Sequence, residues 1–162
     1  MGYWEINVST YLKSLLDQLD ESTDLQSLNS PLAQAVDIAD HTGTAAYSGF
    51  GVHQGTDENG VALQSVQMSF LLDLAGGRGA ISNGVLVVMD ADAMRWNVTF
   101  AGDVSGAAAA MHSITGSAGD SGLSASNIQG VFVGSPTQPD FLGGFHLQSG
   151  SDSVLGLTIL KQ

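Results

Sequence analysis

A glycine-marked hairpin near the C-terminus constrains the fold of this chain more than any other feature. The runs Gly130-Val-Phe-Val-Gly134 and Leu142-Gly-Gly-Phe145 are strand-like, and the segment between them carries Pro136 and Pro139. Proline cannot donate to a strand ladder, and glycine weakens a strand unless another backbone packs closely there. Glycines at these regular places therefore predict a tightly curved sheet that closes on itself.

The composition fits a β-rich domain and excludes several classes of function. Of the 162 residues, 43% are hydrophobic, 12% are charged and 21 are glycine, which is too apolar for disorder and too glycine-rich for a helical bundle. The net charge is −12, with only four basic residues: Lys13, Arg78, Arg95 and Lys161. Because phosphate binding needs clustered cations, nucleic acid is excluded as a partner. The charge favours a cationic partner, or serves solubility alone.

We expect neither membrane insertion nor cysteine chemistry. No apolar run approaches the ~20 residues that a membrane-spanning helix needs, and no girdle of aromatic residues recurs at strand ends. The chain has no cysteine, which removes disulfides and thiolate metal sites. We interpret residues 1–162 as a single β-barrel domain excised from a longer exported protein.

From Gly43 onward, the sequence predicts eight or nine strands. The clearest alternation runs from Val66 to Leu74, where every second residue is apolar, and a similar pattern runs from Met94 to Phe100. Further strands are expected at 44–54, 80–89, 104–114, 127–133, 141–148 and 153–160, with a loop at 116–126. Short turns between such strands predict a mainly β fold, an antiparallel up-and-down β-barrel of about eight strands.

The N-terminal part has a different pattern. Residues 3–8 alternate and predict a short strand, and Ser9 is a possible helix cap. Apolar residues then recur at spacings of three and four, which is one face of a helix: Leu12, Leu15, Leu16 and Leu19. We expect a helical insertion over residues 9–41, which could plug one end of the barrel or lie against its outer wall.

Several runs in order resemble the C-terminal β-barrel of the transferrin-binding protein B family of Gram-negative surface lipoproteins. They are Gly43–Gly49, Met68–Asp73, Trp96–Gly102, Ile128–Gly134 and Leu142–Phe145. The opening Gly2-Tyr-Trp4 is similar to the first barrel strand of exported proteins that pair a FecR-type domain with such a barrel. The resemblance implies an exported or cell-surface, outer-membrane-associated module of a Gram-negative bacterium.

The resemblance also implies a role without enzymatic activity. Members of that family bind transferrin, complement regulators or haem through loops, so it implies a protein-binding or adhesion-related module with an unknown protein partner. The loops we expect to bind are residues 55–60, 115–127 and 134–140, held on a rigid scaffold. The oligomeric state is left open.

Two other functions stay open at this point. One is a lipocalin-like carrier of a small hydrophobic ligand or haem, and the other is a purely structural module. A barrel of about eight strands can be filled by side chains or hold one small ligand. Large residues on the predicted inward faces favour filling: Met68, Phe70, Trp96, Phe100, Phe132, Phe141 and Phe145.

Neither a catalytic set nor a cofactor site is predicted. The run Gly119-Asp-Ser-Gly122 is similar to a serine-protease nucleophile loop but lacks the rest of that motif. His41, His53, His112 and His146 lack the spacing of a metal-binding helix, although His53 and His146 could meet across a barrel as a zinc or haem pair.

Three further patterns also have ordinary explanations. Asp57-Glu-Asn-Gly60 and Asp90-Ala-Asp92 are oxygen-rich, but each falls short of a calcium loop and is explained by hairpin-turn chemistry. The spacing Gly49-x-Gly51-x-x-x-Gly55 misses the dinucleotide fingerprint and is better explained by sheet curvature. We therefore predict no catalytic residue, no metal and no cofactor.

Overall fold

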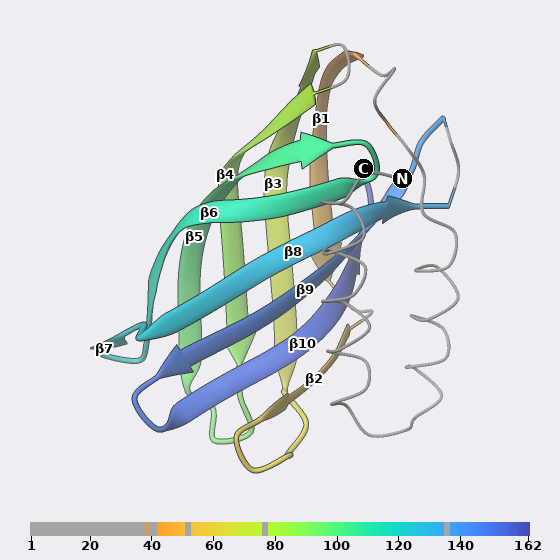
Figure 1. The fold of residues 1–162 in the computed structure, drawn as a ribbon. Coiled ribbons are helices and arrows are strands. Elements are labelled where there is room, and N and C mark those ends of the chain that lie inside the picture. The colour runs from red at the N-terminus through yellow and green to blue at the C-terminus, as the bar shows by residue number, and fades with distance from the viewer. Residues whose placement is uncertain (1–37, 39–41, 51–52, 76–77, 135–136) are drawn as a thin grey trace.

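The computed structural model describes residues 38, 42–50, 53–75, 78–134 and 137–162, which form one antiparallel sheet (Figure 1). The ten strands are β1 (Thr42–Phe50), β2 (His53–Asp57), β3 (Ser65–Ala75), β4 (Arg78–Met89), β5 (Arg95–Ser105), β6 (Ala108–Ala118), β7 (Ser121–Gly122), β8 (Ala125–Val133), β9 (Asp140–Ser149) and β10 (Asp152–Leu160). The mainly β, antiparallel prediction is therefore confirmed. No membrane-crossing helix is found among these residues.

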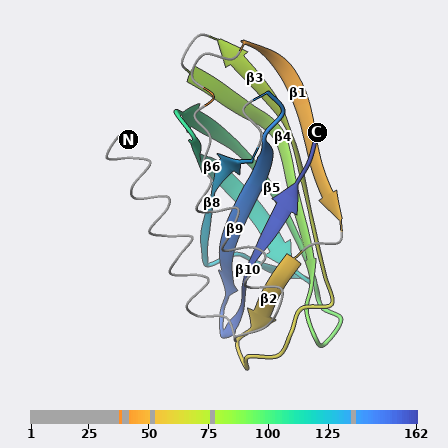
Figure 2. The ribbon, with the colours of Figure 1, turned by 90° about the vertical axis from the view of Figure 1, so that its right-hand side faces the viewer.

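The strand order is β1-β3-β4-β5-β6-β8-β9-β10-β2, and the two-residue β7 pairs with β6. Consecutive hairpins build most of this order, as the short turns predict. The sheet curls strongly into a half-barrel, so that β8, β9 and β10 run obliquely across β1 and β3 in Figure 1. Figure 2 shows these two parts of the same sheet as facing layers.

The two ends of the strand order lie close together. The short strand β2 pairs with β10, with Asp57 opposite Val154. Further along, Ser48 of β1 and Lys161, just after β10, exchange two backbone hydrogen bonds of 3.0 and 2.9 Å. Both β1 and β2 therefore contact the last strand segment of the chain.

The inward face of the sheet is filled by large apolar side chains. Along β3, inward residues such as Phe70 are buried while Leu71 on the outer face is 45% exposed. Aromatic rings pack against one another, with centroids of Phe70 and Phe141 at 5.0 Å and of Phe132 and Phe141 at 5.1 Å. All seven predicted inward residues are buried: Met68, Phe70, Trp96, Phe100, Phe132, Phe141 and Phe145. The prediction of a filled interior is confirmed at these positions.

Glycines in mid-strand make room for these rings. A methyl group built on Gly130 of β8 would overlap the ring of Phe141 and lie 2.7 Å from the carbonyl oxygen of Leu142. A methyl group on Gly156 of β10 would lie 2.9 Å from Cζ of Phe145, the residue opposite it in the ladder. The glycine-marked hairpin thus has a physical cause, which is the close approach of a ring and a backbone to each glycine.

Two predicted strand boundaries are wrong for the same reason. We expected a new strand over 104–114 and a loop at 116–126, but β5 runs through to Ser105, and residues 116–118 still belong to β6. A methyl group on Gly102 would lie 2.6 Å from Sδ of Met111, so Gly102 serves close packing inside a strand. The real turn follows Ser105, where Gly106 has a φ of 62°.

The N-terminal predictions fall outside the described residues. These are the strand at 3–8 and the helical insertion at 9–41, of which the structure describes Ile38 alone. The side chain of Ile38 is 1% exposed, and its backbone N–H donates to the carbonyl oxygen of Gly106 at 3.1 Å. The chain therefore enters the described fold beside the β5–β6 turn.

Replacing Phe70 with alanine tests the filled interior. Because Phe70 is 2% exposed and stacks on Tyr47 at 5.3 Å, we expect Phe70→Ala to lower the free energy of unfolding by about 3–5 kcal/mol. Its neighbour on the outer face provides the control, since Leu71→Ala should change stability by less than about 1 kcal/mol. Thermal or denaturant unfolding measures both, and equal effects would show the inward assignment to be wrong.

Candidate functional site

Three hollows among the described residues open to solvent, and Met68, Phe70 and Trp96 line none of them. One of about 150 Å³ opens beside Tyr47, Leu72 and Pro139. The hydroxyl of Tyr47 donates to the Pro139 carbonyl oxygen at 2.9 Å and accepts from Nε2 of Gln162 at 3.0 Å. Burial raises the pKa of Tyr47, the Gln162 hydrogen bond opposes that rise, and the charge of Asp140 adds to it. This tyrosine ties together the loop before β9 and the residues after β10.

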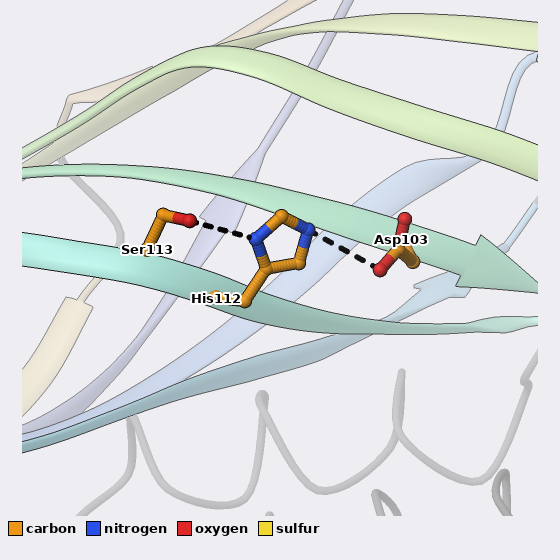
Figure 3. A network of polar contacts seen from close by, with 3 residues as sticks. All are labelled: Asp103, His112 and Ser113. Carbon is orange, nitrogen blue, oxygen red and sulfur yellow. Dashed lines mark hydrogen bonds and ion pairs between the residues drawn. The ribbon is translucent and has the colours of Figure 1, made fainter.

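A polar network lies on the outer face of β5 and β6 (Figure 3). Nε2 of His112 is 3.2 Å from Oδ2 of Asp103, and Nδ1 of His112 is 3.1 Å from Oγ of Ser113. Ser113 has a φ of 53° where the pairing of β5 with β6 shifts register, which marks a β-bulge. On the turn side of the bulge the pairing is regular, with Ala101 opposite His112 and Asp103 opposite Ala110, which places His112 diagonally across from Asp103. An open hollow of about 500 Å³ adjoins both residues and Arg78.

These residue types suggest a hydrolase triad, but the geometry is different. In such triads the carboxylate holds Nδ1 of the histidine while the serine faces Nε2. Here the two ring nitrogens are exchanged, and the side chains of His112 and Asp103 are 51% and 75% exposed. A carboxylate surrounded by water does not hold an imidazole rigidly. The network is a surface feature of the two strands and not a nucleophile site.

The turns at one end of the sheet bring together most of the described acidic residues. The pairings Asp57–Val154, Met89–Arg95, Trp96–Ala118 and Asp152–Ser149 place four connections at this end. Three of them form the lower end of the fold in Figure 1. Six of the nine described acidic residues lie in these turns, and we call them the acidic end: Asp57, Glu58, Asp90, Asp92, Asp120 and Asp152. Arg78 and Lys161 lie at the opposite end, and Arg95, at the start of β5, is the one described basic residue at the acidic end, so the charge is polarised along the strands.

Two of these carboxylates fix the shape of their own turns. Oδ1 of Asp57 accepts from the backbone N–H groups two and four residues later, at 2.8 and 3.0 Å. Oδ1 of Asp90 does the same, at 3.0 Å for both bonds, and its Oδ2 accepts from Nε1 of Trp96 at 3.3 Å. Hairpin-turn chemistry therefore explains both oxygen-rich runs. The described residues include no group of three or more potential metal ligands.

The remaining acidic residues repel one another across neighbouring turns. Glu58 lies beside the β9–β10 turn, where its Oε2 accepts from the N–H of Ser153 at 3.4 Å. A hydrogen bond with Glu58 raises the pKa of Asp152, partial burial adds to this, and the charges of Glu58, Asp90 and Asp92 raise it further. Three turns that are far apart in sequence thus share one electrostatic field.

The other residues singled out from the sequence do not form a site. His53 pairs with Thr158 and His146 with Leu155, so β10 separates them by about 10 Å across and about 10 Å along the strands. The prediction that they could meet is therefore wrong. Nδ1 of His53 is buried and has no hydrogen-bond partner in the described part of the chain. His41 lies outside the described residues.

Backbone geometry also explains the two glycine-containing sequence patterns. In the protease-like run, Gly119 has a φ of 58° and Ser121–Gly122 forms β7. Methyl groups on Gly49 and Gly55 would lie 2.5 and 2.6 Å from carbonyl oxygens of Ile159 and Leu155. Close strand approach accounts for both glycines.

Sequence reasoning missed the polarised charge and the His112 network. Neither is a local motif, because the acidic residues are spread over almost one hundred positions and the contact of His112 with Asp103 depends on the pairing of β5 with β6. The sequence does show an acidic residue in each of these turns. Only the up-and-down strand order, however, shows that alternate turns lie at the same end of the sheet.

Comparison with known proteins gives limited information. No protein-family model and no curated protein matches this sequence. One similar solved structure is that of intact Ap-TbpB with its N and C lobes, at 17% identity and a TM-score of 0.46. The match covers 79% of this chain and 28% of that chain. Likeness of this extent does not establish membership of a family.

Replacing Asp152 with asparagine tests the repulsion at the acidic end. Because the pKa of Asp152 is raised above its ordinary 3.8, folding is disfavoured once the pH exceeds the folded-state value, and the penalty vanishes below the unfolded-state value. We expect Asp152→Asn to raise the melting temperature at pH 7 and to leave it unchanged near pH 3. Asp73→Asn, on the exposed face of β3, is the control. A lower melting temperature for Asp152→Asn at pH 7 would contradict the account.

Proposed function

We propose that this protein is a non-enzymatic binding module that engages a cationic protein partner through its acidic end. The observation that carries the proposal is the convergence of six acidic residues, from four turns, on one end of a solidly packed sheet. These turns, at residues 57–60, 90–93, 119–120 and 150–152, contain no lysine or arginine, and Arg95 at the start of β5 is the one described basic residue at this end. A field of one sign steers an oppositely charged partner and aligns it before contact.

The acidic residues divide between scaffold and contact surface. Asp57 and Asp90 are 7% and 3% exposed and hold their turns through backbone hydrogen bonds, so they serve as scaffold. Glu58, Asp92 and Asp120 face solvent and are available to basic side chains of a partner. Two of the three loops predicted to bind, 55–60 and 115–127, contribute to this end. The third, 134–140, lies at the opposite end, because Asp140 follows the turn after Val133.

We further infer that the sheet closes as an eight-stranded barrel. Taking β1 and β2 as one strand and leaving the two-residue β7 aside reduces ten strands to eight. The Ser48–Lys161 bridge and the β2–β10 pairing support this closure, because they join the first strand to the last. Closure would also remove exposed strand edges. The exported or cell-surface location is part of the proposal and rests on the sequence resemblance alone.

The carrier alternative is not favoured. Met68, Phe70 and Trp96, which would line an internal ligand cavity, are at most 2% exposed and line none of the three surface hollows. The third of these hollows, about 460 Å³, lies outside the sheet near Asn83 and Ser113. A purely structural module remains the competing function, and it is one outcome of the binding test.

A variant with three neutralised carboxylates provides that test. We would measure its binding of fluorescence-labelled octalysine in a low-salt buffer. The end variant Glu58→Gln/Asp92→Asn/Asp152→Asn should weaken binding at least about fivefold. The control Asp73→Asn/Asp103→Asn/Asp140→Asn removes the same charge from elsewhere and should weaken it by less than about twofold. Fluorescence anisotropy measures both. Equal losses, or no measurable binding by the parent protein, would overturn the proposed binding end and leave the structural module.

A further inference from the structure

The strand β1 is joined to the end of the chain over only part of its length. It lies at one end of the strand order, so one of its sides pairs with β3 and the other faces the seam between the first and last strands. Figure 2 shows β1 at the margin of the fold, beside the C-terminus. Across the seam, Ser48 and Lys161 exchange their two backbone hydrogen bonds. Among the described strands, none pairs with β1 on this side between Thr42 and Tyr47.

Two residues of β1 direct their backbone hydrogen-bonding groups to this open part of the seam. Successive residues of a strand turn their N–H and C=O groups to alternate sides, so Ala46 and Thr44 face the same side as Ser48. Both residues are exposed, and none of their seam-facing groups has a hydrogen-bond partner in the described part of the chain. We call residues Thr44–Ala46 the free edge. Unpaired backbone groups in such a row are a template for an added strand.

The free edge carries none of the usual protection against strand addition. Natural sheets guard exposed edges with lysine, proline or a β-bulge. The sequence from Thr42 to Ser48 has no lysine or proline, and its pairing with β3 has no shift of register. The free edge ends at Gly43, where φ is 105° and the backbone leaves the extended region. It therefore offers four backbone groups to a short partner strand.

The hollow beside Tyr47 adjoins the free edge on its inner side. Its lining includes Ala45, Leu72 and Leu74 on the inward face of β1 and β3, and Pro139 from the loop before β9. Its volume is about 150 Å³, and an apolar cavity of about that size holds a benzene molecule. Side chains of an added strand would alternate between the two faces of the sheet. The side chain opposite Ala45 would therefore enter this hollow.

We propose that the free edge binds an extended peptide segment of another protein, antiparallel to β1, with one medium-sized apolar side chain in the hollow beside Tyr47. The added strand follows the direction that Lys161 already takes along β1. Hydrogen bonds to the backbone of Ala46 and Thr44 provide affinity, and the hollow selects the side chain. Thr44 pairs with Asp73 near the β3–β4 turn, at the end of the sheet opposite the acidic end. The two binding sites are therefore independent.

A second copy of the same chain fits this site poorly. If two free edges paired with each other, the inward residues facing each hollow would be Gly43 and Ala45 of the other copy. A hydrogen atom and a methyl group leave most of the hollow empty. Each chain also carries a net charge of −12, so two copies repel each other. A larger apolar side chain from a different protein suits the hollow better.

The capped, uncharged peptide acetyl-Thr-Leu-Thr-Val-Thr-amide is the probe, titrated into the ¹⁵N-labelled protein and followed by NMR. We expect the amide resonances of Ala46 and Thr44 to shift and their hydrogen exchange to slow, with half-saturation below about 1 mM. Replacing the leucine of the peptide with alanine should weaken binding at least about fivefold, because the hollow is then left unfilled. Since the probe has no charge, its binding does not depend on the acidic end.

Methylation of alternate peptide nitrogens provides the matched control. N-methyl groups on the first and third threonines remove the N–H groups that face β1 and should abolish binding, whereas those on leucine and valine should weaken it less than about threefold. In the protein, Ala46→Pro removes a seam-facing donor and leaves the ladder with β3 intact, so it should abolish binding, and Ala46→Thr should keep it.

Three results would overturn the proposal. They are no resonance shift of the parent protein at about 5 mM peptide, equal losses from the two sets of N-methyl groups, and protection of the Ala46 amide that grows with protein concentration in the absence of peptide. The last result would assign the free edge to a second copy. The N-methyl comparison uses the unaltered protein, so it decides the question even if Ala46→Pro does not fold.

Discussion

Aromatic rings that lie over glycines on the neighbouring strand are the interaction on which the rest of this fold depends. The pairing occurs between β4 and β5, where a methyl group on Gly84 would overlap the ring of Phe100, and it recurs at Phe141 over Gly130 and at Phe145 over Gly156. A tightly curled sheet leaves little room inside, and at Phe100 and Phe145 the residue opposite the ring in the ladder is a glycine, which has no side chain to occupy that room. The glycines therefore allow both the curvature and the filling.

A filled interior moves any binding function to the surface. Phe141 contacts both Phe70 and Phe132, so protein side chains fill the space between these strands in which a carrier would hold a ligand. What varies along the surface is charge, and the up-and-down order gathers acidic turns at one end while Arg78 and Lys161 lie at the other. Asp57 and Asp90 use their carboxylates to shape the turns, and the neighbouring Glu58 and Asp92 remain available to a partner.

Sequence-based prediction was correct for the parts of the fold whose structure is determined by a single physical cause, such as the burial of one face of a strand. The alternation from Val66 to Leu74 was interpreted correctly, because one face of β3 is buried and the other is exposed. The start of a new strand was wrongly predicted just after Gly102, since glycine serves tight turns and close packing equally well and a single sequence does not separate the two. The contact of His112 with Asp103 depends on the register of β5 and β6, and the acidic end depends on strand order. Both are properties of tertiary structure without a local signature.

The strands that contain the glycine–phenylalanine hairpin also carry buried apolar residues on the face opposite the rings, such as Val131 and Leu142. The most direct test of the central claim is an NMR assignment of the glycine Hα resonances in the whole chain. A ring held face-on over a glycine moves its Hα resonances upfield, so Gly84, Gly130 and Gly156 should all be shifted upfield relative to Gly122, which has no neighbour within 4 Å of a built methyl group. Unshifted resonances at all three glycines would contradict the account.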